Sequence, residues 1–329
     1  MGQRMVVVED AKTDPKWGKR PQDRTTGELA TSCFVLVDKP EGPNSHQVAA
    51  WVRQIFGAER AGHAGTLDPN ATGLLLIAVG DATKALAVVE GADKRYVGHI
   101  AFQHEGDPAA FRRLASEFAG PVLQVPPKKS AVKRVRRVRR VYALNVLEAT
   151  PRSALVDVAC EAGTYIRTIA HDMGLVLGVG ANLRDLRRTG VGPFTLAEAS
   201  SLSQLRDAFE NARALGSDDR LRPLLRPVED LLAGHRKVVI KDSAVDAVCH
   251  GAPLLAPGLS ALDSGIASGD EVALMTLKGE AVAVARAALA SEKMADASRG
   301  AVATPTRVLM KAGTYPRGWK GKRKAPPAA

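Results

Sequence analysis

The sequence Gly62-His63-Ala64-Gly65-Thr66-Leu67-Asp68-Pro69-Asn70-Ala71-Thr72-Gly73, followed by Leu74-Leu75-Leu76-Ile77-Ala78-Val79, joins a shaped loop to an uninterrupted apolar run. Three glycines, one proline and a single carboxylate within twelve residues are typical of a loop with a defined path. Pro69 biases Asp68 toward an extended backbone, so we expect Asp68 to be held in place. The apolar run predicts a buried strand. The structural alternative is an aspartate that only organises its own loop through an Asx turn.

The segments on either side of this loop predict a mixture of helices and strands. Upstream, Cys33 to Asp38 is apolar and β-prone, and Ser45 is expected to cap a helix that Gly57 ends. Downstream, Asp81 is expected to cap a helix over Ala82 to Val89. The further predicted elements are strands at Tyr96 to Phe102, Tyr142 to Leu147 and Ala154 to Cys160, and helices at Ala109 to Phe118 and Ile166 to Leu177.

The chain is too long for one hydrophobic core, because 329 residues exceed the ~250 to 300 that a single core usually organises. The two prolines near Arg222 to Pro227 mark a boundary. Beyond it, short strands and frequent glycines predict a small β barrel. We therefore expect an N-terminal extension with little core of its own (1–32), a main domain (33–228), the barrel (235–312) and a basic flexible tail (313–329).

Composition excludes several classes of protein. The chain is 45% apolar and 25% charged, as in soluble globular proteins. It has no apolar stretch of the ~18 residues that a bilayer span needs, and its first residues lack the pattern of a signal peptide. Cys33, Cys160 and Cys249 are odd in number and widely spaced, which favours neither a disulfide framework nor a zinc ribbon. These features fit a reducing cytoplasm.

The net charge of +11 is concentrated in two segments. Without the fourteen basic residues of Lys128 to Arg140 and Lys311 to Lys324, 32 Lys and Arg remain against 35 Asp and Glu. The positive charge is therefore local, and phosphate binding is favoured over a merely solubilising role. The candidate RNA-binding residues lie in a predicted basic hairpin (126–142): Lys128, Lys129, Lys133, Arg134, Arg136, Arg137, Arg139 and Arg140.

Four ordered blocks of sequence carry a resemblance to a known family. They are the loop above, Lys94-Arg95-Tyr96, Pro126-Pro127-Lys128-Lys129-Ser130-Ala131-Val132-Lys133, and Cys160-Glu161-Ala162-Gly163-Thr164-Tyr165-Ile166-Arg167. Together they resemble the TruB family of RNA pseudouridine synthases, and more narrowly its archaeal and eukaryotic dyskerin-like branch, the catalytic subunits of H/ACA guide-RNA particles. The resemblance runs from about Cys33 to beyond Trp319, and residues 235–312 are similar to a PUA RNA-binding domain.

The resemblance implies a fold and a set of site residues. It implies an α+β protein, with a mixed-sheet catalytic domain and a C-terminal small β-barrel PUA domain. Asp68 would be the nucleophile, Arg167 its ion-pair partner, and Tyr96 a residue that stacks on the flipped base and mediates proton transfer at C5. Tyr165 and Leu186 would line the pocket, and His63 would lie near the flipped nucleotide or stabilise the loop. Uridine isomerisation requires no metal or organic cofactor.

The same resemblance implies partners and leaves alternatives. In guide-dependent relatives a guide RNA pairs with both flanks of the target, so the protein reads backbone and shape. The expected partners are guide RNA, target rRNA or tRNA, a zinc-ribbon or β-hairpin subunit, a β-barrel subunit that contacts the basic hairpin, and a kink-turn binding protein that joins through RNA. The alternatives are a stand-alone tRNA pseudouridine synthase and a noncatalytic RNA-binding scaffold. A glycoside hydrolase fits less well, because that chemistry usually needs two facing carboxylates.

Overall fold

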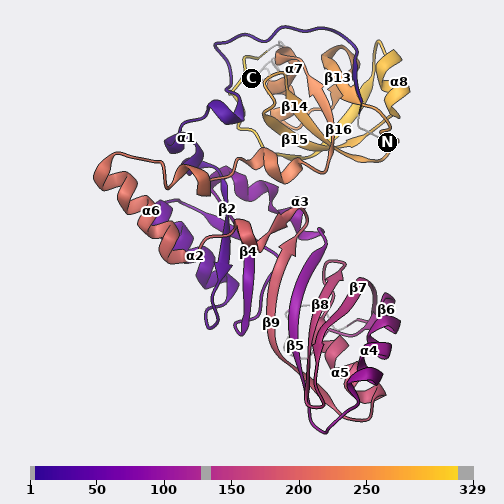
Figure 1. Cartoon of the computed structure of the whole chain (residues 1–329). Helices are drawn as coiled ribbons and strands as arrows, with labels where there is room; N and C mark the ends of the chain where they lie inside the picture. Colours follow the sequence, from indigo (N-terminus) through magenta and orange to yellow (C-terminus); the bar gives the residue numbers. More distant parts are fainter. Residues whose placement is uncertain (1–3, 127–134, 318–329) are drawn as a thin grey trace, which may run out of the picture. The chain divides into compact units, whose positions relative to one another are not determined.

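A computed structural model of the chain describes residues 4–126 and 135–317 (Figure 1). The described residues form two compact units. The larger unit comprises the described residues within Phe34–Val79 and Leu86–Leu224. The smaller unit comprises the described residues within Met1–Cys33, Gly80–Ala85 and Leu225–Ala329. Helices and mixed sheets occur in both units, which confirms the predicted α+β class.

The larger unit is built on one mixed sheet. Its strands are β2 (Phe34–Lys39), β3 (Ala61–Ala64), β4 (Ala71–Val79), β5 (Lys94–Phe102), β6 (Gly120–Gln124), β7 (Arg137–Ala149), β8 (Ser153–Cys160), β9 (Ala181–Val191) and β10 (Phe194–Thr195). In the described part of the chain the order is β2-β4-β9-β5-β8-β7-β6, with β3 beside β4 and β10 beside β9. Among the strand pairs of this sheet in the described residues, only β4–β9 is parallel. Its register places Ala71, the first residue of β4, beside Leu186 in the middle of β9.

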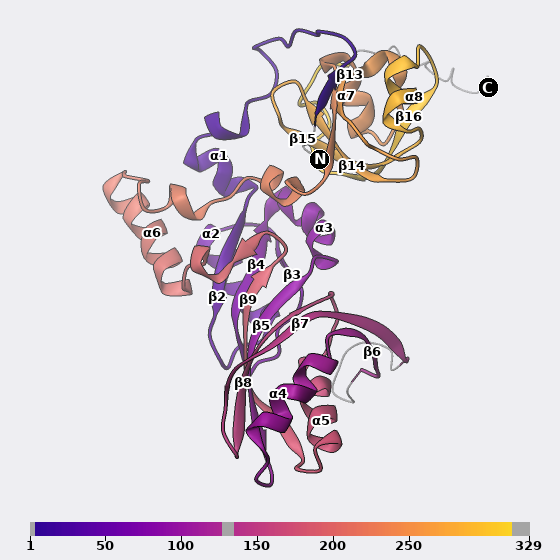
Figure 2. The same ribbon diagram turned by 45° about the vertical axis from the view of Figure 1, so that its right-hand side comes forward.

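Helices pack against the sheet of the larger unit. The helices are α2 (Ser45–Phe56), α3 (Leu86–Glu90), α4 (Pro108–Glu117), α5 (Ile166–Val176) and α6 (Leu202–Leu215), with short 3₁₀ turns at Leu196–Glu198 and Arg222–Leu224. Side chains of α4 and α5 bury a core against β5, β7 and β8, and both views show these two helices on the same side of the strands (Figures 1 and 2). The continuous apolar run of β4 is almost wholly buried, as its sequence predicts.

Two local predictions in and beside the larger unit were wrong. The N-cap of α2 is Asn44, whose side chain accepts from the Gln47 N–H, and not Ser45. Ser45 is instead fully buried and bonds to the backbone of Leu67. The expected helix over residues 82–89 is split into a 3₁₀ segment (Gly80–Ala85) and the short helix α3. The division between the two units falls at this same junction.

The smaller unit is also built on a mixed sheet. Its strands are β1 (Met5–Val7), β11 (Arg236–Ile240), β12 (Leu254–Leu255), β13 (Leu259–Asp263), β14 (Glu271–Thr276), β15 (Ala281–Ala287) and β16 (Ala301–Val308). The helices are α1 (Thr26–Thr31), α7 (Asp242–Cys249) and α8 (Ser291–Asp296), with 3₁₀ turns at Pro21–Asp23, Val228–Leu232 and Ala256–Gly258. In the described chain the strand order is β1-β13-β11-β14-β15-β16-β12.

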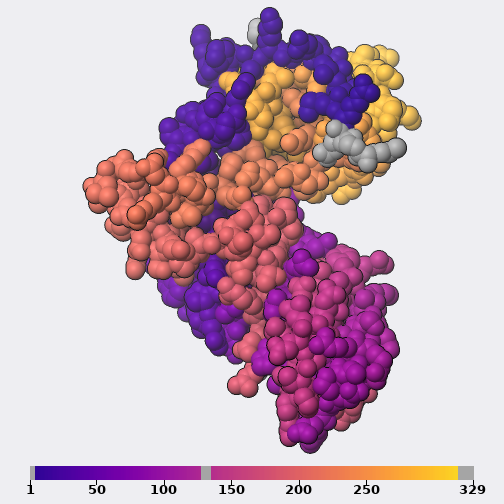
Figure 3. Space-filling model, viewed as in Figure 1, coloured from indigo at the N-terminus to yellow at the C-terminus, as the bar shows by residue number. Residues whose placement is uncertain are grey.

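The N-terminal segment packs on the smaller unit's sheet. Strand β1 pairs with β13, so this segment shares a core with residues far along the chain instead of extending alone. Further along, the Lys19 N–H donates to the Glu280 carboxylate, and the Lys278 ammonium donates to the Asp14 carbonyl. Both hydrogen bonds join the N-terminal segment to residues near the C-terminal end of the chain. Figure 3 shows the segment, in indigo, lying over the orange and yellow C-terminal residues. A sequence without helical or strand periodicity thus becomes ordered by long-range pairing.

Candidate active site

The loop that carries Asp68 connects β3 to β4, and hydrogen bonds from two buried side chains to its backbone hold it in place. The hydroxyl of Ser45 donates to the Leu67 carbonyl (3.0 Å) and accepts from the Leu67 N–H (2.8 Å). The ammonium group of Lys39, a fully buried residue, donates to the carbonyls of Pro40 (2.8 Å) and Pro69 (3.1 Å). The residues on both sides of Asp68 are therefore anchored, and its side chain is left free to face outward.

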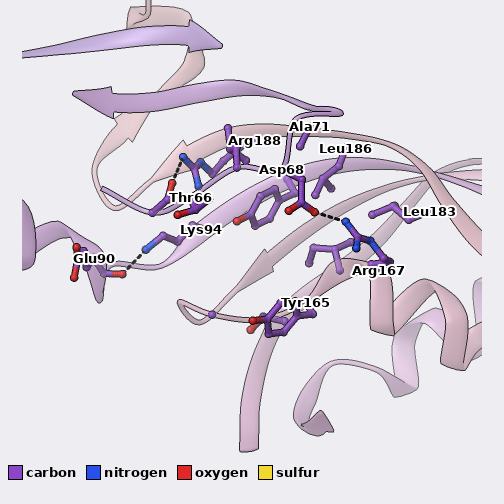
Figure 4. Close-up of a pocket in the computed structure, with 16 residues that line it drawn as sticks. Thr66, Asp68, Ala71, Glu90, Lys94, Tyr165, Arg167, Leu183, Leu186 and Arg188 are labelled. Atoms are coloured by element: carbon purple, nitrogen blue, oxygen red, sulfur yellow. Dashed lines mark hydrogen bonds and ion pairs between the residues drawn. The ribbon is translucent and has the colours of Figure 1, made fainter. Parts of the chain in front are cut away.

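Asp68 opens into a cavity of about 460 Å³ (Figure 4). The cavity lies within the larger unit, and its walls come from the Asp68 loop, α3, β5, the β8–α5 connection, α5 and β9. Its size falls in the range of small-ligand sites, roughly 300–1,000 Å³. The lining residues are Gly65, Thr66, Leu67, Asp68, Ala71, Glu90, Lys94, Tyr96, Gly163, Thr164, Tyr165, Ile166, Arg167, Leu183, Leu186 and Arg188.

An ion pair joins Asp68 to Arg167 across this cavity. Arg167 is the second residue of α5, and its guanidinium group donates to the Asp68 carboxylate (Figure 4). Both side chains remain about half exposed, at 59% for Asp68 and 50% for Arg167. Within the described chain Arg167 is the side chain that bonds to this carboxylate, so its other lone pairs face the cavity. The structure thus brings together two residues that the sequence nominated 99 positions apart.

Tyr165 is held at the cavity by the edge of the sheet. Gln124, the last residue of β6, is buried, and its amide exchanges two hydrogen bonds with the Tyr165 backbone (3.0 and 2.9 Å). This clamp fixes the start of α5, where Tyr165 is the N-cap residue and Arg167 follows two positions later. Leu186 and Leu183 of β9 complete the apolar part of the wall.

Tyr96 lies on β5, with its side chain in the cavity wall. Its hydroxyl hydrogen-bonds to the guanidinium group of Arg188. Burial raises the pKa of Tyr96; the positive charge of Arg188 and its hydrogen bond oppose that shift, whereas Cys160 and Asp68 add to it. The structure therefore brings five residues that the resemblance nominated into one cavity: Asp68, Tyr96, Tyr165, Arg167 and Leu186.

Two buried cations in the same wall were not identified from the sequence. Arg188 is 1% exposed and Lys94 is 6% exposed. The Lys94 ammonium donates to the carbonyls of Glu90 (2.7 Å) and Ala92 (2.5 Å) at the end of α3, and burial lowers its pKa to about 8. The sequence did contain a signal for their position, because side chains two residues apart on a strand lie on the same face of the sheet. Lys94 is two residues before Tyr96, and Arg188 is two residues after Leu186.

His63 lies outside the Asp68 cavity. It faces a neighbouring cavity of about 620 Å³ that shares Thr66 and Glu90 with the first. Its ring packs edge-on against His46, with ring centroids 4.7 Å apart, and its two nitrogens are buried without a hydrogen-bond partner. Burial, helped by the charges of His46 and Arg188, lowers the pKa of His63 to about 4. The ring is therefore neutral at physiological pH.

Half of the candidate RNA-binding residues fall in the described part of the chain. Arg137, Arg139 and Arg140 lie on β7, which pairs with β6, and Arg136 precedes it. Arg136 and Arg140 are exposed, whereas Arg139 is partly buried and pairs with Glu161 (2.9 Å). Lys128, Lys129, Lys133 and Arg134 lie outside the described residues.

Two further features are absent from the described residues. Among residues 4–126 and 135–317, no group of three or more His, Cys, Asp or Glu side chains is arranged to hold a metal ion. None of the helices found there is both long and apolar enough to cross a bilayer.

Four protein-family models match the chain. They are "DKCLD (NUC011) domain" at residues 2–49, "TruB family pseudouridylate synthase (N terminal domain)" at 53–109, "tRNA pseudouridylate synthase B C-terminal domain" at 167–233 and "PUA domain" at 236–309. Two curated relatives, both named "Probable tRNA pseudouridine synthase B", are each 48% identical. The one from Pyrobaculum arsenaticum covers 98% of both chains, and the one from Methanosarcina acetivorans covers 98% of this chain and 95% of its own.

Solved structures resemble the whole chain. A chain in "Structure of H/ACA RNP bound to a substrate RNA containing 2'-deoxyuridine" superposes with a TM-score of 0.88 at 37% identity, and covers 97% of this chain and 98% of its own. A chain in "Crystal Structure of a Cbf5-Nop10-Gar1 Complex" gives a TM-score of 0.88 at 39% identity, over 96% and 97%. The expected C-terminal PUA domain is confirmed by the family match.

Proposed function

The chain belongs to the TruB family of RNA pseudouridine synthases, and from this premise we propose that it is the catalytic subunit of an H/ACA-type ribonucleoprotein that isomerises guide-selected uridines. Isomerisation breaks the bond from N1 to C1′ and forms one from C5 to C1′. Hydrogen leaves C5 and N1 gains one, so the reaction has no net redox change. What the protein must supply is a nucleophile, a proton acceptor and a pocket for the everted nucleotide.

The observation that carries this proposal is the Asp68–Arg167 pair in a cavity of nucleoside size. A carboxylate with free lone pairs can add to the base or to the ribose, or assist departure of the base, and then be released. Arg167 binds one carboxylate oxygen, and Asp68 lines the cavity with its side chain 59% exposed. The Asp68 loop itself supplies a single carboxylate, whereas glycoside hydrolysis usually uses a facing pair.

The remaining walls suit a flipped uracil. Tyr96 and Tyr165 offer aromatic surfaces for stacking, and Leu183 and Leu186 supply an apolar boundary. The Tyr96 hydroxyl, held by Arg188, is our candidate for the group that removes the proton from C5. His63 supports the loop from the neighbouring cavity.

The RNA is held mainly through its phosphates. Exposed Arg136 and Arg140 beside β6 and β7 provide cations, and the PUA domain provides a second RNA-binding element. Everting a base costs on the order of a few kcal/mol, least in single-stranded RNA. A guide that pairs with both flanks of the target would leave the uridine unpaired and deliver it to Asp68.

Similar structures suggest the other components of the particle. Their titles name a substrate RNA bound to an H/ACA RNP, and Cbf5 in complexes with Nop10 and Gar1. We infer that this chain likewise assembles with guide RNA and small accessory subunits to modify rRNA. We assign this activity to the cytoplasm, a compartment that fits the free thiols of Cys33, Cys160 and Cys249.

The test is a release assay with a guide. The full chain is reconstituted with an H/ACA guide RNA, the accessory subunits and a short target RNA that carries tritium at C5 of its uridines. We expect tritium to be released with the matched guide and not with a guide that is mismatched to the target. Equal release with matched and mismatched guides would overturn guidance but not isomerisation. Absence of release under every condition would overturn both.

A second function is favoured by the names of the relatives, which denote a tRNA pseudouridine synthase. The same assay includes tritiated tRNA with the chain alone. Turnover of tRNA without guide or subunits, at a rate comparable with the guided reaction, would establish the stand-alone activity as the main one.

A further inference from the structure

Arg188 is a buried arginine with an unusual set of partners. It lies on β9, and its Nε donates to the Leu74 carbonyl (2.7 Å) and its Nη2 to the Gly65 carbonyl (2.9 Å). Its third partner is the hydroxyl of Tyr96. Within residues 4–126 and 135–317 it makes no ion pair with a carboxylate. A guanidinium group is always charged, so this charge is balanced by two carbonyl dipoles and a phenol only.

Such an arrangement is costly, because a buried charge normally requires an opposite charge. An arginine whose only role was to join β4 to β9 could be replaced by a neutral donor at lower cost. The position next to the reacting group suggests why the charge is kept. Arg188 stands in the cavity wall near Lys94, on the side away from Arg167 (Figure 4).

Two glycines of the Asp68 loop lie directly against Arg188, one at its side chain and one at its backbone. At Gly73 (φ +99°), a Cβ atom would lie 2.3 Å from the Arg188 carbonyl oxygen, and at Gly65 (φ +69°) it would lie 3.3 Å from Nη1 of Arg188. Gly65 thus leaves room for the guanidinium group of Arg188, and Gly73 lets β4 approach the backbone of β9 at the same position. The loop that presents Asp68 therefore packs directly against the arginine that contacts Tyr96.

We propose that Arg188 is a positioning residue for the isomerisation: its guanidinium group holds the Tyr96 oxygen by a hydrogen bond and stabilises that oxygen as a phenolate able to accept the C5 proton. The inference rests on the function proposed above. In the step, the Tyr96 phenol first loses its proton to solvent. Once C5 is bonded to C1′, the phenolate oxygen takes the proton from C5 and the C5–H electron pair restores the C5–C6 double bond. The π pair of the N1–C6 double bond moves to N1, which takes a proton from solvent. Tyr96 is left as a phenol and the pseudouridine is complete.

The charges around Tyr96 make Arg188 the group that favours the phenolate. Burial, Cys160 on β8 and Asp68 on the loop all raise the pKa of Tyr96, and Arg188 alone among the described influences lowers it. Loss of the guanidinium charge should therefore raise the pKa of Tyr96 further. The fraction of Tyr96 present as phenolate at neutral pH would fall, and the rate would reach its limit only at higher pH.

The experiment compares single-turnover tritium release by the reconstituted particle over a range of pH. Arg188→Met keeps the length of the side chain but removes every donor. We expect its rate at pH 7 to fall at least about ten-fold, with the alkaline rise displaced upward by about one pH unit or more. Arg188→Lys, which keeps a positive charge, should recover part of both effects. The matched control is Arg187→Lys on the same strand, whose partners are Asp38 and Thr72, and it should stay within two-fold of the wild type.

A second measurement separates positioning from support of the fold. Replacing Tyr96 by 3-fluorotyrosine makes the phenol more acidic without removing it, so it should restore activity to Arg188→Met and move the pH profile back. If Arg188→Met fails to fold, the Nε–H resonance of Arg188 in the wild type is followed by NMR instead. It should titrate with the Tyr96 phenol, and this titration should be absent in Tyr96→Phe.

The outcomes are distinct. An Arg188→Met profile that matches the wild type, or a loss of rate that fluorotyrosine cannot relieve, would overturn the role of Arg188 while leaving the isomerase assignment intact. A wild-type particle that releases no tritium would instead overturn the proposed function itself.

Discussion

Two carboxylates, one in each unit, are held in opposite ways. Glu280 in the smaller unit is 4% exposed and accepts hydrogen bonds from the Thr276 hydroxyl (3.0 Å), the Tyr315 hydroxyl and the Lys19 N–H (2.9 Å). Asp68 in the larger unit is more than half exposed and, in the described chain, is bonded by one side chain, that of Arg167. The first carboxylate has its lone pairs occupied, and the second does not.

The difference separates a structural acid from a reactive one. A carboxylate saturated with donors stabilises its surroundings but has no lone pair left for a substrate. An exposed carboxylate with a single partner contributes little to stability, since exposed ion pairs are worth about 0–1 kcal/mol. Substitution of either residue should therefore change one property, rate or stability, and leave the other nearly unaltered.

The largest expected effect is on the rate of Asp68→Asn. The amide keeps the size of the side chain but cannot act as a nucleophile, so isomerisation should fall at least about a thousand-fold. The free energy of unfolding should change by less than about 1 kcal/mol, because the lost pair is exposed. Tritium release and urea unfolding measure the two quantities. A variant with near wild-type turnover would remove Asp68 from the mechanism.

The next largest effect is on stability and not on rate: Glu280→Ala should lower the free energy of unfolding of the smaller unit. Removing the carboxylate leaves the buried donors of Thr276 and Tyr315 without an acceptor, which should cost about 3 kcal/mol. Trp17 reports on this unit in a background with Trp51 and Trp319 replaced by phenylalanine. Glu271→Ala, whose side chain is 55% exposed, is the control and should cost less than about 1 kcal/mol. Equal losses in the two variants would contradict the comparison.

A third, intermediate effect depends on pH and belongs to the larger unit. His63 has its pKa lowered from 6.5 to about 4, so between these values the unfolded chain binds a proton that the folded chain does not. Stability should therefore fall as pH drops from about 6.5 to about 4, by about 2 kcal/mol once partial exposure is discounted.

The measurement is acid unfolding followed by Trp51, which shares α2 with His46. His63→Phe keeps an aromatic ring against His46 and removes the titrating nitrogens, so the difference between the two chains isolates the contribution of His63. Identical slopes for the wild type and His63→Phe would show that His63 does not cause the loss. The smaller unit, followed by Trp17, should not respond to this substitution.

The parts of the site that the sequence could predict are those with local signals. Asp68 is marked by its glycines and Pro69, and β4 by its apolar run, because loops and buried strands are encoded within a few neighbouring residues. The pairing of Asp68 with Arg167 required the resemblance between ordered blocks, since the two residues are far apart in the chain. Ser45 illustrates the limit: its residue type suits a cap, but the neighbouring Asn44 takes that role and Ser45 supports Leu67.

The parts that could not be predicted depend on long-range packing. Lys94 and Arg188 resemble ordinary strand cations. Their ammonium and guanidinium groups are buried against carbonyls that α3, β4 and the Asp68 loop bring to them. The same holds for the N-terminal segment, whose order comes from β13 and from Glu280. No window of local sequence contains these partners, although the two-residue period of a strand places Arg188 on the face of Leu186.

The smallest effect is expected for Tyr315→Phe in the smaller unit. Tyr315 is 1% exposed, and burial together with its hydrogen bond to Glu280 raises its pKa. The phenyl ring would keep the packing and remove one donor, at a cost of about 1 kcal/mol. Trp17 fluorescence during urea unfolding measures it. Because Thr276 and the Lys19 N–H still hold the carboxylate, this loss should be clearly smaller than that of Glu280→Ala. A loss as large as that of Glu280→Ala would mean that Tyr315 alone holds Glu280, and the contrast with singly bonded Asp68 would then have to rest on burial and not on the number of donors.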